Sequence, residues 1–274
     1  MHLALIGYGN IARQLLAVLA REEALPARLT VLALPEFVAG VRQALAEDLP
    51  ATSVADTEIV TDSAALIAAR PDLVVECAGH AAVQAHATAV LRAGLDVLIV
   101  SIGALADPAL QQAVQAAARA GGARAILPAG AVGGVDILAA LRASGISAVR
   151  YTSRKPPLAW TGTPAETLLD LPGLREATEF FAGNARQAAL EYPKNANVAA
   201  TLALAGLGFE ATEVRMIADP AVSRNVHEFA VTAGAADFTI RIEGHPSPDN
   251  PKTSQTTVYS VAREILNRMR EVAI

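Results

Sequence analysis

Two histidines are the side chains of this chain best suited to proton transfer. An imidazole titrates near neutral pH, so it can take up or release a proton under physiological conditions. His227 lies in the polar segment DPAVSRNVHEF, and His80 directly follows the run VVECAG. A single histidine on the apolar face of a strand is more often a core residue. Spacing alone therefore leaves three alternatives: a catalytic His227, a catalytic His80, and a His227 that is only packed in the core.

A glycine-rich turn near the N-terminus has the spacing that binds a dinucleotide. A short apolar strand runs into G-x-G-x-x-A, and a helix follows. The first glycine permits the tight turn, the second lets a pyrophosphate approach the backbone, and the alanine lets helix and strand pack closely. The helix N-terminus adds a partial positive charge. We predict cofactor contacts at Gly7, Gly9, Asn10 and Ile11, and the alternative is a turn that merely starts an α/β fold.

Two later loops lie where open α/β folds bind their ligands, at the carboxyl edge of the expected sheet. Ala78 and Gly79 follow the fourth expected strand, and the run PAGAVGG, which contains Ala131, follows the sixth. Three glycines in that run allow a planar ring to approach the backbone closely. The alternative for PAGAVGG is a hinge between domains.

The segment PKNAN (193–197) opens an apolar helix and holds two asparagines. Asn195 either caps the helix or faces a ligand. Asn197 is expected one turn inside the helix, where an amide has little use as a cap and is a mediocre helix former. A ligand contact is therefore favoured for Asn197.

Composition and charge exclude several classes of protein. The net charge is −5, and the Lys and Arg residues form no basic stripe, which disfavours nucleic-acid binding. No apolar run is long enough to span a bilayer, and we expect no membrane association. One cysteine and five scattered histidines give no metal-ligand spacing, so no metal site is expected. With no signal peptide recognised and no possible intramolecular disulfide, we expect a cytoplasmic protein.

The elements that must position these residues alternate in the first half of the chain. Apolar runs without two-fold alternation indicate strands buried on both faces of a parallel sheet. The expected strands are 3–6, 29–34, 58–62, 72–78, 96–101 and 124–129, and the expected helices are 10–21, 36–46, 63–69, 80–93 and 107–120. This pattern is typical of a doubly wound nucleotide-binding domain.

The second half has a different pattern, typical of a more antiparallel sheet with helices. Its expected strands are 148–155, 213–219, 226–233 and 237–244, with a hairpin turn at 234–236 and helices near 164–170, 184–190 and 195–207. We predict a crossing loop for residues 245–254. The final segment is predicted to be an amphipathic helix that returns to the first domain.

The predicted fold class is therefore α/β, a Rossmann-type doubly wound parallel sheet with a second α+β domain built on a mixed sheet. The first domain comprises residues 1–130 and 251–274. Residues 131–250 form the second, which we expect to carry the substrate site and the dimer contact.

The acidic residue that usually binds the adenosine ribose after the second strand is not evident, because that strand ends in Leu34-Pro35-Glu36. Glu36 is one candidate for the ribose, and Arg42 is a candidate for a 2′-phosphate. The choice between NAD and NADP stays open on the sequence.

Six motifs occur in order along the chain: GYGNIA, ECAGH, PAGAVGG, TSRKPP, YPKNANVAATLALAG and DPAVSRNVHEF. Through them the chain resembles the L-aspartate dehydrogenases from end to end. The resemblance implies reversible NAD(P)-dependent deamination of L-aspartate, through iminoaspartate to oxaloacetate and ammonia, with iminoaspartate as a possible source for NAD biosynthesis. By motif, Ala131 and Asn197 match the family's cofactor contacts, and His227 matches its catalytic histidine. A homodimer is also implied, consistent with common symmetry.

Two carboxylates of such a substrate need cationic or amide partners. The candidates are Arg154, Lys155, Lys194, Arg224 and Asn225. Two alternatives to the family reading remain: another NAD(P)-dependent oxidoreductase with the architecture of dihydrodipicolinate reductase or homoserine dehydrogenase, and a non-catalytic sensor that binds NAD(P).

Overall fold

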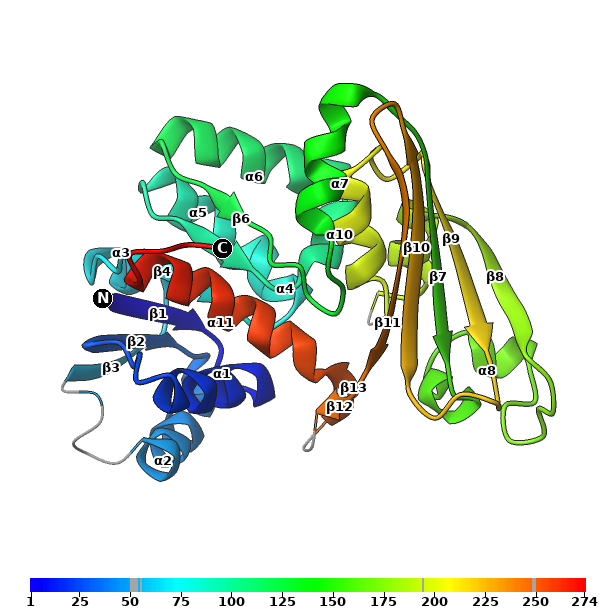
Figure 1. Ribbon diagram of the computed structural model, residues 1–274. Coiled ribbons are helices and arrows are strands. Elements are labelled where there is room, and N and C mark those ends of the chain that lie inside the picture. The colour runs from blue at the N-terminus through cyan, green and yellow to red at the C-terminus, as the bar shows by residue number, and fades with distance from the viewer. Residues whose placement is uncertain (50–53, 55, 194, 248–249) are drawn as a thin grey trace. The chain divides into compact units, whose positions relative to one another are not determined.

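The computed structural model describes residues 1–49, 54, 56–193, 195–247 and 250–274. The chain forms two compact units, and the chain passes from the first to the second and back (Figure 1). Unit 1 comprises Met1–Pro128 and Val258–Ile274, and unit 2 comprises Ala129–Thr257. The boundaries expected from the sequence lie slightly later at the first junction and earlier at the second.

Unit 1 is built on a six-stranded parallel sheet in the order β3-β2-β1-β4-β5-β6. Its strands are β1 (His2–Ile6), β2 (Arg28–Leu32), β3 (Asp56–Val60), β4 (Leu73–Glu76), β5 (Val97–Ile99) and β6 (Ala125–Ile126). The order reverses between β1 and β4, which is the point where doubly wound sheets bind dinucleotides. The predicted Rossmann-type fold is confirmed.

Helices accompany this sheet: α1 (Asn10–Arg21), α2 (Val38–Asp48), α3 (Ser63–Ala68), α4 (His80–Ala82), α5 (Thr88–Arg92), α6 (Pro108–Gly121) and α11 (Gln255–Met269), with a π-helical stretch at Val83–Ala87. The longer ones, such as α1, α6 and α11, bury an apolar stripe. The residues of α11 from Val258 on belong to unit 1, where Val261 and Ile265 are fully buried in its core. The predicted return of the last helix is confirmed.

Unit 2 is a five-stranded mixed sheet in the order β11-β10-β7-β9-β8, in which only β7 and β9 are parallel. The strands are β7 (Ile146–Lys155), β8 (Thr178–Asn184), β9 (Thr212–Ala218), β10 (Asn225–Ala233) and β11 (Asp237–Gly244). The helices are α7 (Val135–Leu141), α8 (Ala165–Leu168), α9 (Ala185–Glu191) and α10 (Asn197–Ala205). The predicted hairpin joins β10 to β11.

Alternation along the strands separates the two faces of this sheet. On β7, Tyr151, Ser153 and Lys155 are buried, and on β10, His227 and Phe229 are buried. Helices α9 and α10 contact these strands or their neighbours, so this is the covered face. The intervening residues lie on the other face.

Two segments that were not predicted as strands form strands in the structure. Residues 178–184 form the edge strand β8, which was not predicted, because a register shift between Glu179 and Phe181 breaks the two-fold alternation. Part of the expected crossing loop pairs as β12 (Pro246–Ser247) and β13 (Asn250–Ser254). Within the described ranges, no helix is both long and apolar enough to cross a bilayer.

Candidate functional site

The glycine turn of unit 1 contains one glycine that the fold requires and another that leaves room for a ligand. Gly7 has a φ of +87°, and a Cβ placed there would lie 2.6 Å from Cβ of Ala78. Gly7 is therefore required by the fold itself. Gly9 precedes α1, and a Cβ placed there meets nothing within 4 Å. The first turn of α1, which begins with Asn10 and Ile11, carries no acidic side chain that would oppose a bound phosphate.

A pocket of about 640 Å³ opens beside this turn within unit 1. The end of β2, one side of α2 and the helical segment after β4 complete its wall, together with the exposed Leu34 and Phe37. Among the described residues that line it, none is Asp, Glu, Lys or Arg. Neither Glu36 nor Arg42 is part of this lining. The pocket therefore has the apolar walls that an adenosine needs, and it carries no acid that would repel a 2′-phosphate.

Glu76, which the sequence analysis did not single out, is a fully buried carboxylate at the end of β4. Its Oε1 accepts hydrogen bonds from the N–H groups of Ala78 and Gly79 at 2.8 and 2.7 Å, and from the Ser101 hydroxyl at 3.1 Å. Its Oε2 accepts the Ser101 N–H at 3.0 Å. The signal available in the sequence was a glutamate at the end of an otherwise apolar strand, because buried charges are rarely left without partners.

In unit 2, His227 lies on the covered face of the sheet with long polar side chains on both sides of it. It pairs with Ser153 in the register of β10 and β7. Tyr151 and Lys155, two residues before and after Ser153, are therefore its diagonal neighbours across the strands. The Tyr151 hydroxyl and Nδ1 of His227 are 2.7 Å apart, and the two rings stack. Tyr151 is the second residue of the candidate site that the sequence analysis missed.

Burial keeps this cluster uncharged or close to losing its charge. Desolvation, helped by the positive charge of Lys155, lowers the pKa of His227 to about 3. Desolvation also lowers the pKa of Lys155 to about 8 and raises that of Tyr151. His227 is therefore a neutral imidazole at physiological pH, and the Tyr151 phenol keeps its proton.

Lys155 is held in a defined position although it is buried. Its Nζ donates a 2.7 Å hydrogen bond to Oδ1 of Asn195 and lies 4.6 Å from the ring centroid of Trp160. The ring favours a cation at this place. Asn195 thus holds Lys155 and does not cap α10, since Ala196 is the N-cap residue and makes no side-chain cap bond.

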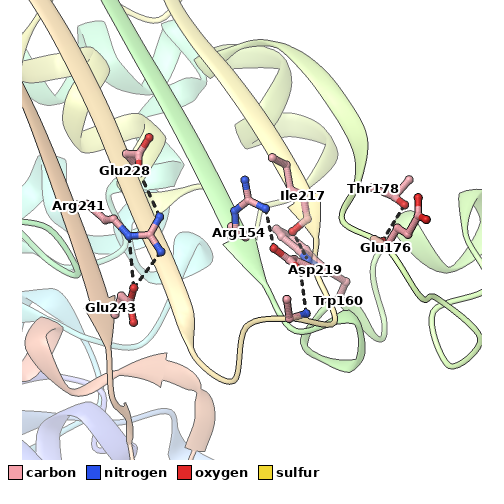
Figure 2. A network of polar contacts seen from close by, with 10 residues as sticks. Arg154, Trp160, Glu176, Thr178, Ile217, Asp219, Glu228, Arg241 and Glu243 are labelled. Atoms are coloured by element: carbon pink, nitrogen blue, oxygen red, sulfur yellow. Dashed lines mark hydrogen bonds and ion pairs between the residues drawn. The ribbon is translucent and has the colours of Figure 1, made fainter.

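Arg154 lies on the opposite face from His227 because it is adjacent to Lys155 in the strand. It donates a 2.6 Å hydrogen bond to the buried carboxylate of Asp219 (Figure 2). Asp219 also accepts the N–H of Ala221. Although burial raises the pKa of the Asp219 carboxyl, these bonds hold it below its usual value. The geometry gives Arg154 a role in fixing the loop after β9, and it separates Arg154 from the histidine.

The other predicted donors are spread over unit 2. Arg224 is exposed and lies 3.4 Å from Nε2 of His245. Asn225 is the first residue of β10, two residues before His227. Lys194 lies outside the described residues.

Two predicted cofactor contacts also lie in unit 2. Ala131 is buried in the loop before α7, and Asn197 is half-buried. Asn197 is the first residue of α10, so the expectation that it lies one turn inside the helix was wrong. His80 begins α4 in unit 1, directly after the loop held by Glu76. In the part of the chain that the structure describes, no three His, Cys, Asp or Glu side chains gather as a metal site would require.

Comparisons with known proteins relate both units to dehydrogenases. A family model described as "Aspartate dehydrogenase, C-terminal" matches residues 136–268, and one described as "Homoserine dehydrogenase, NAD binding domain" matches residues 7–128. The L-aspartate dehydrogenases of Polaromonas sp. and Ralstonia nicotianae are 44% and 45% identical to this chain over 274 residues, which cover 100% of each chain.

The solved structure of aspartate dehydrogenase from Thermotoga maritima aligns with a TM-score of 0.74 and 26% identity, over 100% of this chain and 99% of that one. These matches favour the enzyme over the alternative of a non-catalytic sensor. The chain belongs to the L-aspartate dehydrogenase family.

Proposed function

We propose that this protein oxidises L-aspartate with NAD or NADP, giving iminoaspartate, which water converts to oxaloacetate and ammonia. In balanced form, L-aspartate, NAD(P)⁺ and water give oxaloacetate, ammonium, NAD(P)H and a proton. The observation that carries the proposal is the buried His227, flanked by Tyr151 and Lys155, in a chain of this family. We further propose that the reaction is reversible and takes place in the cytoplasm, and that its iminoaspartate can feed NAD biosynthesis.

The residues of unit 1 fit the dinucleotide. Gly9 leaves room for its pyrophosphate, and the apolar pocket beside the turn suits its adenosine. We assign its binding to Gly7, Gly9, Asn10, Ile11, Ala78 and Gly79 and, by the motifs of the family, also to Ala131 and Asn197. When bound, the cofactor supplies the acceptor for the hydride that leaves Cα of aspartate.

We assign the proton transfer of the hydrolytic step to Nε2 of His227. For Nε2 to accept a proton, Nδ1 must carry one, and the oxygen of Tyr151 is then the acceptor that stabilises this tautomer. A neutral imidazole can take a proton from the attacking water, and the negative charge of a bound dicarboxylate raises the low pKa of His227 toward the working range.

We assign one substrate carboxylate to the ammonium group of Lys155. Lys155 is the predicted cation that shares a sheet face with His227. A carboxylate at Nζ would pair a charge that Asn195 and Trp160 only partly compensate. Asn225, Arg224 and Lys194 remain candidates for the second carboxylate.

The direct test is to incubate the purified protein with L-aspartate and either NAD or NADP and to follow reduced nicotinamide by absorbance. We expect turnover with both cofactors, because no acidic side chain lines the described pocket. A kcat/KM ratio above about a thousandfold in favour of NAD, roughly 4 kcal/mol, would mean that an acid such as Glu36 reaches the ribose. Absence of turnover with L-aspartate, alongside oxidation of homoserine by NAD(P)⁺ or reduction of dihydrodipicolinate by NAD(P)H, would overturn the substrate assignment.

The change Gly9→Val is expected to weaken cofactor binding at least tenfold, about 1.4 kcal/mol, while the fold is kept. A Cβ at this position meets nothing within 4 Å in the protein, and the valine side chain would enter the space that we assign to the pyrophosphate. Calorimetric dissociation constants and melting temperatures check this. Gly7→Val is the contrast, since its Cβ would clash with Ala78 and lower the melting temperature. An unchanged cofactor affinity in Gly9→Val would place the pyrophosphate elsewhere.

We also propose a homodimer formed through the face of the unit 2 sheet that α9 and α10 do not cover. Arg241 lies between Glu228 and Glu243 on this face (Figure 2), and Arg150 pairs with Glu213. Neighbouring charges of both signs suit a contact with a second copy, because each copy presents the partner charge to the other.

A further inference from the structure

The four hydrogen bonds to Glu76 join two loops that are far apart in the sequence. Ala78 and Gly79 follow β4, whereas Ser101 follows β5. Both loops leave the carboxyl edge of the sheet in unit 1, in the half of the fold that begins with β4. In a doubly wound sheet, the half built on the first three strands takes one mononucleotide and the half that begins with β4 takes the other.

The loop after β4 also contacts the glycine turn. Ala78 lies against Gly7 so closely that no Cβ fits between them, and the N–H of Cys77 donates to the carbonyl of Ile6. A carboxylate that fixes Ala78 therefore fixes the place where the two halves of the dinucleotide site meet.

We propose that Glu76 is a positioning residue for the nicotinamide half of the cofactor site: its buried carboxylate holds the loops after β4 and β5 in the form that receives the ring. This inference rests on the proposed dinucleotide function and adds to it a residue with no contact to the reacting atoms. A carboxylate suits the task because both of its oxygens accept, and the surrounding groups are all donors.

Glutamine is the sharpest substitution because it keeps the shape of the side chain and changes one acceptor into a donor. If the amide nitrogen takes the place of Oε2, it faces the Ser101 N–H, and if it takes the place of Oε1, it faces those of Ala78 and Gly79. Either orientation sets two donors against each other at hydrogen-bond distance. At least one loop must therefore move.

The experiment compares NADH with ADP-ribose, which lacks the nicotinamide, by calorimetric titration of the full chain. In the unmodified protein we expect NADH to bind more tightly than ADP-ribose. In Glu76→Gln we expect this advantage to fall at least fivefold, because NADH loses more affinity than ADP-ribose, whose smaller loss comes through the pocket wall that Ala78 shares. If Glu76 were needed only for stability, its substitution would lower the affinities for NADH and ADP-ribose by the same factor. The matched control is Glu58→Gln, the same change at an exposed side chain of unit 1, where neither affinity should change.

A second variant covers the case in which Glu76→Gln does not fold. Ser101→Ala removes the hydroxyl bond to Oε1 and keeps the three backbone bonds, so the NADH advantage should fall about twofold. Equal losses for NADH and ADP-ribose, or no change in either variant that folds, would overturn the role of Glu76. If the unmodified protein binds ADP-ribose and NADH equally, the positioning proposal fails while the cofactor assignment stands. If it binds neither, the proposed function fails with it.

Discussion

The change His227→Ala is expected to lower kcat for L-aspartate oxidation by roughly 10²- to 10⁴-fold, the loss typical of a missing acid–base group. Among the described residues, Tyr151 is the hydrogen-bond partner of the imidazole, and the backbone pairing of β10 with β7 does not depend on this side chain, so its removal leaves the sheet pairing intact. The affinity for the cofactor should change little. Steady-state kinetics with L-aspartate and calorimetric titration with NADH measure the two effects separately.

His80→Ala is the control, because His80 follows the loop after β4 and is the other histidine that the sequence favours. It should lower kcat much less. Near-normal turnover in His227→Ala, or a large loss confined to His80→Ala, would transfer the catalytic role to His80.

The low pKa of His227 also predicts that the unmodified protein and His227→Ala differ in their stability toward acid. The folded pKa of about 3 is below the usual 6.5, so the unfolded chain binds a proton between these values that the folded chain does not. The neutral His227 therefore adds to the free energy of unfolding in full above pH 6.5, and this addition is lost as the pH falls toward 3. Part of the acid destabilisation should therefore disappear in His227→Ala. A lower melting temperature at pH 8 with normal turnover would instead identify a core histidine.

The change Lys155→Met is expected to lower kcat/KM for L-aspartate by about 30- to 1000-fold, mainly through KM. This corresponds to the roughly 2–4 kcal/mol lost when one partner of a buried charge pair is removed. Methionine keeps much of the packing against Trp160 and cannot bind a carboxylate. KM for the cofactor should stay within about threefold. Kinetics at saturating cofactor measure the effect.

Arg154→Met is the matched control, one residue away on the other face of β7. It should destabilise the protein, because Asp219 loses its partner, and leave KM for L-aspartate nearly unchanged. A large rise in KM for Arg154→Met and not for Lys155→Met would reverse the assignment.

The pH profile offers a second measurement of Lys155. Its pKa of about 8 means that the free protein loses this positive charge as the pH rises through 8. If the ammonium binds a carboxylate, kcat/KM for L-aspartate should fall in that range, because kcat/KM reports the ionisation of the free enzyme. The fall should be absent in Lys155→Met, whose remaining activity does not depend on this charge.

The sequence predicted the first sheet well because its strands are continuous apolar runs, and the glycine turn has a spacing with a direct steric reason. It was harder to predict on which face of the second sheet a given side chain lies. Two-fold alternation separates Arg154 from Lys155, but only the pairing of β7 with β10 shows which of them shares a face with His227. That register joins residues more than seventy positions apart, and no local pattern encodes it.

The same reason explains the two missed residues. Tyr151 became part of the candidate site through the pairing of strands, and Glu76 through Ser101, which belongs to a different loop. The beginning of α10 was predicted two residues early because Asn195 is a residue type that starts helices, whereas its side chain binds Lys155 and the helix begins at Asn197. Each of these errors concerns a tertiary contact or an element boundary, where local propensity decides little.

The return of α11 to unit 1 has a consequence for how the chain acquires its structure during synthesis. Val258, Val261, Ala262 and Ile265 are almost completely buried in the core of unit 1, although the ribosome makes them after all of unit 2. The sheet that is translated first therefore stays without part of its apolar cover while more than a hundred residues are added. Unit 2 is contiguous in the chain and can fold as soon as it emerges. In this protein the domain begun first is the one completed last.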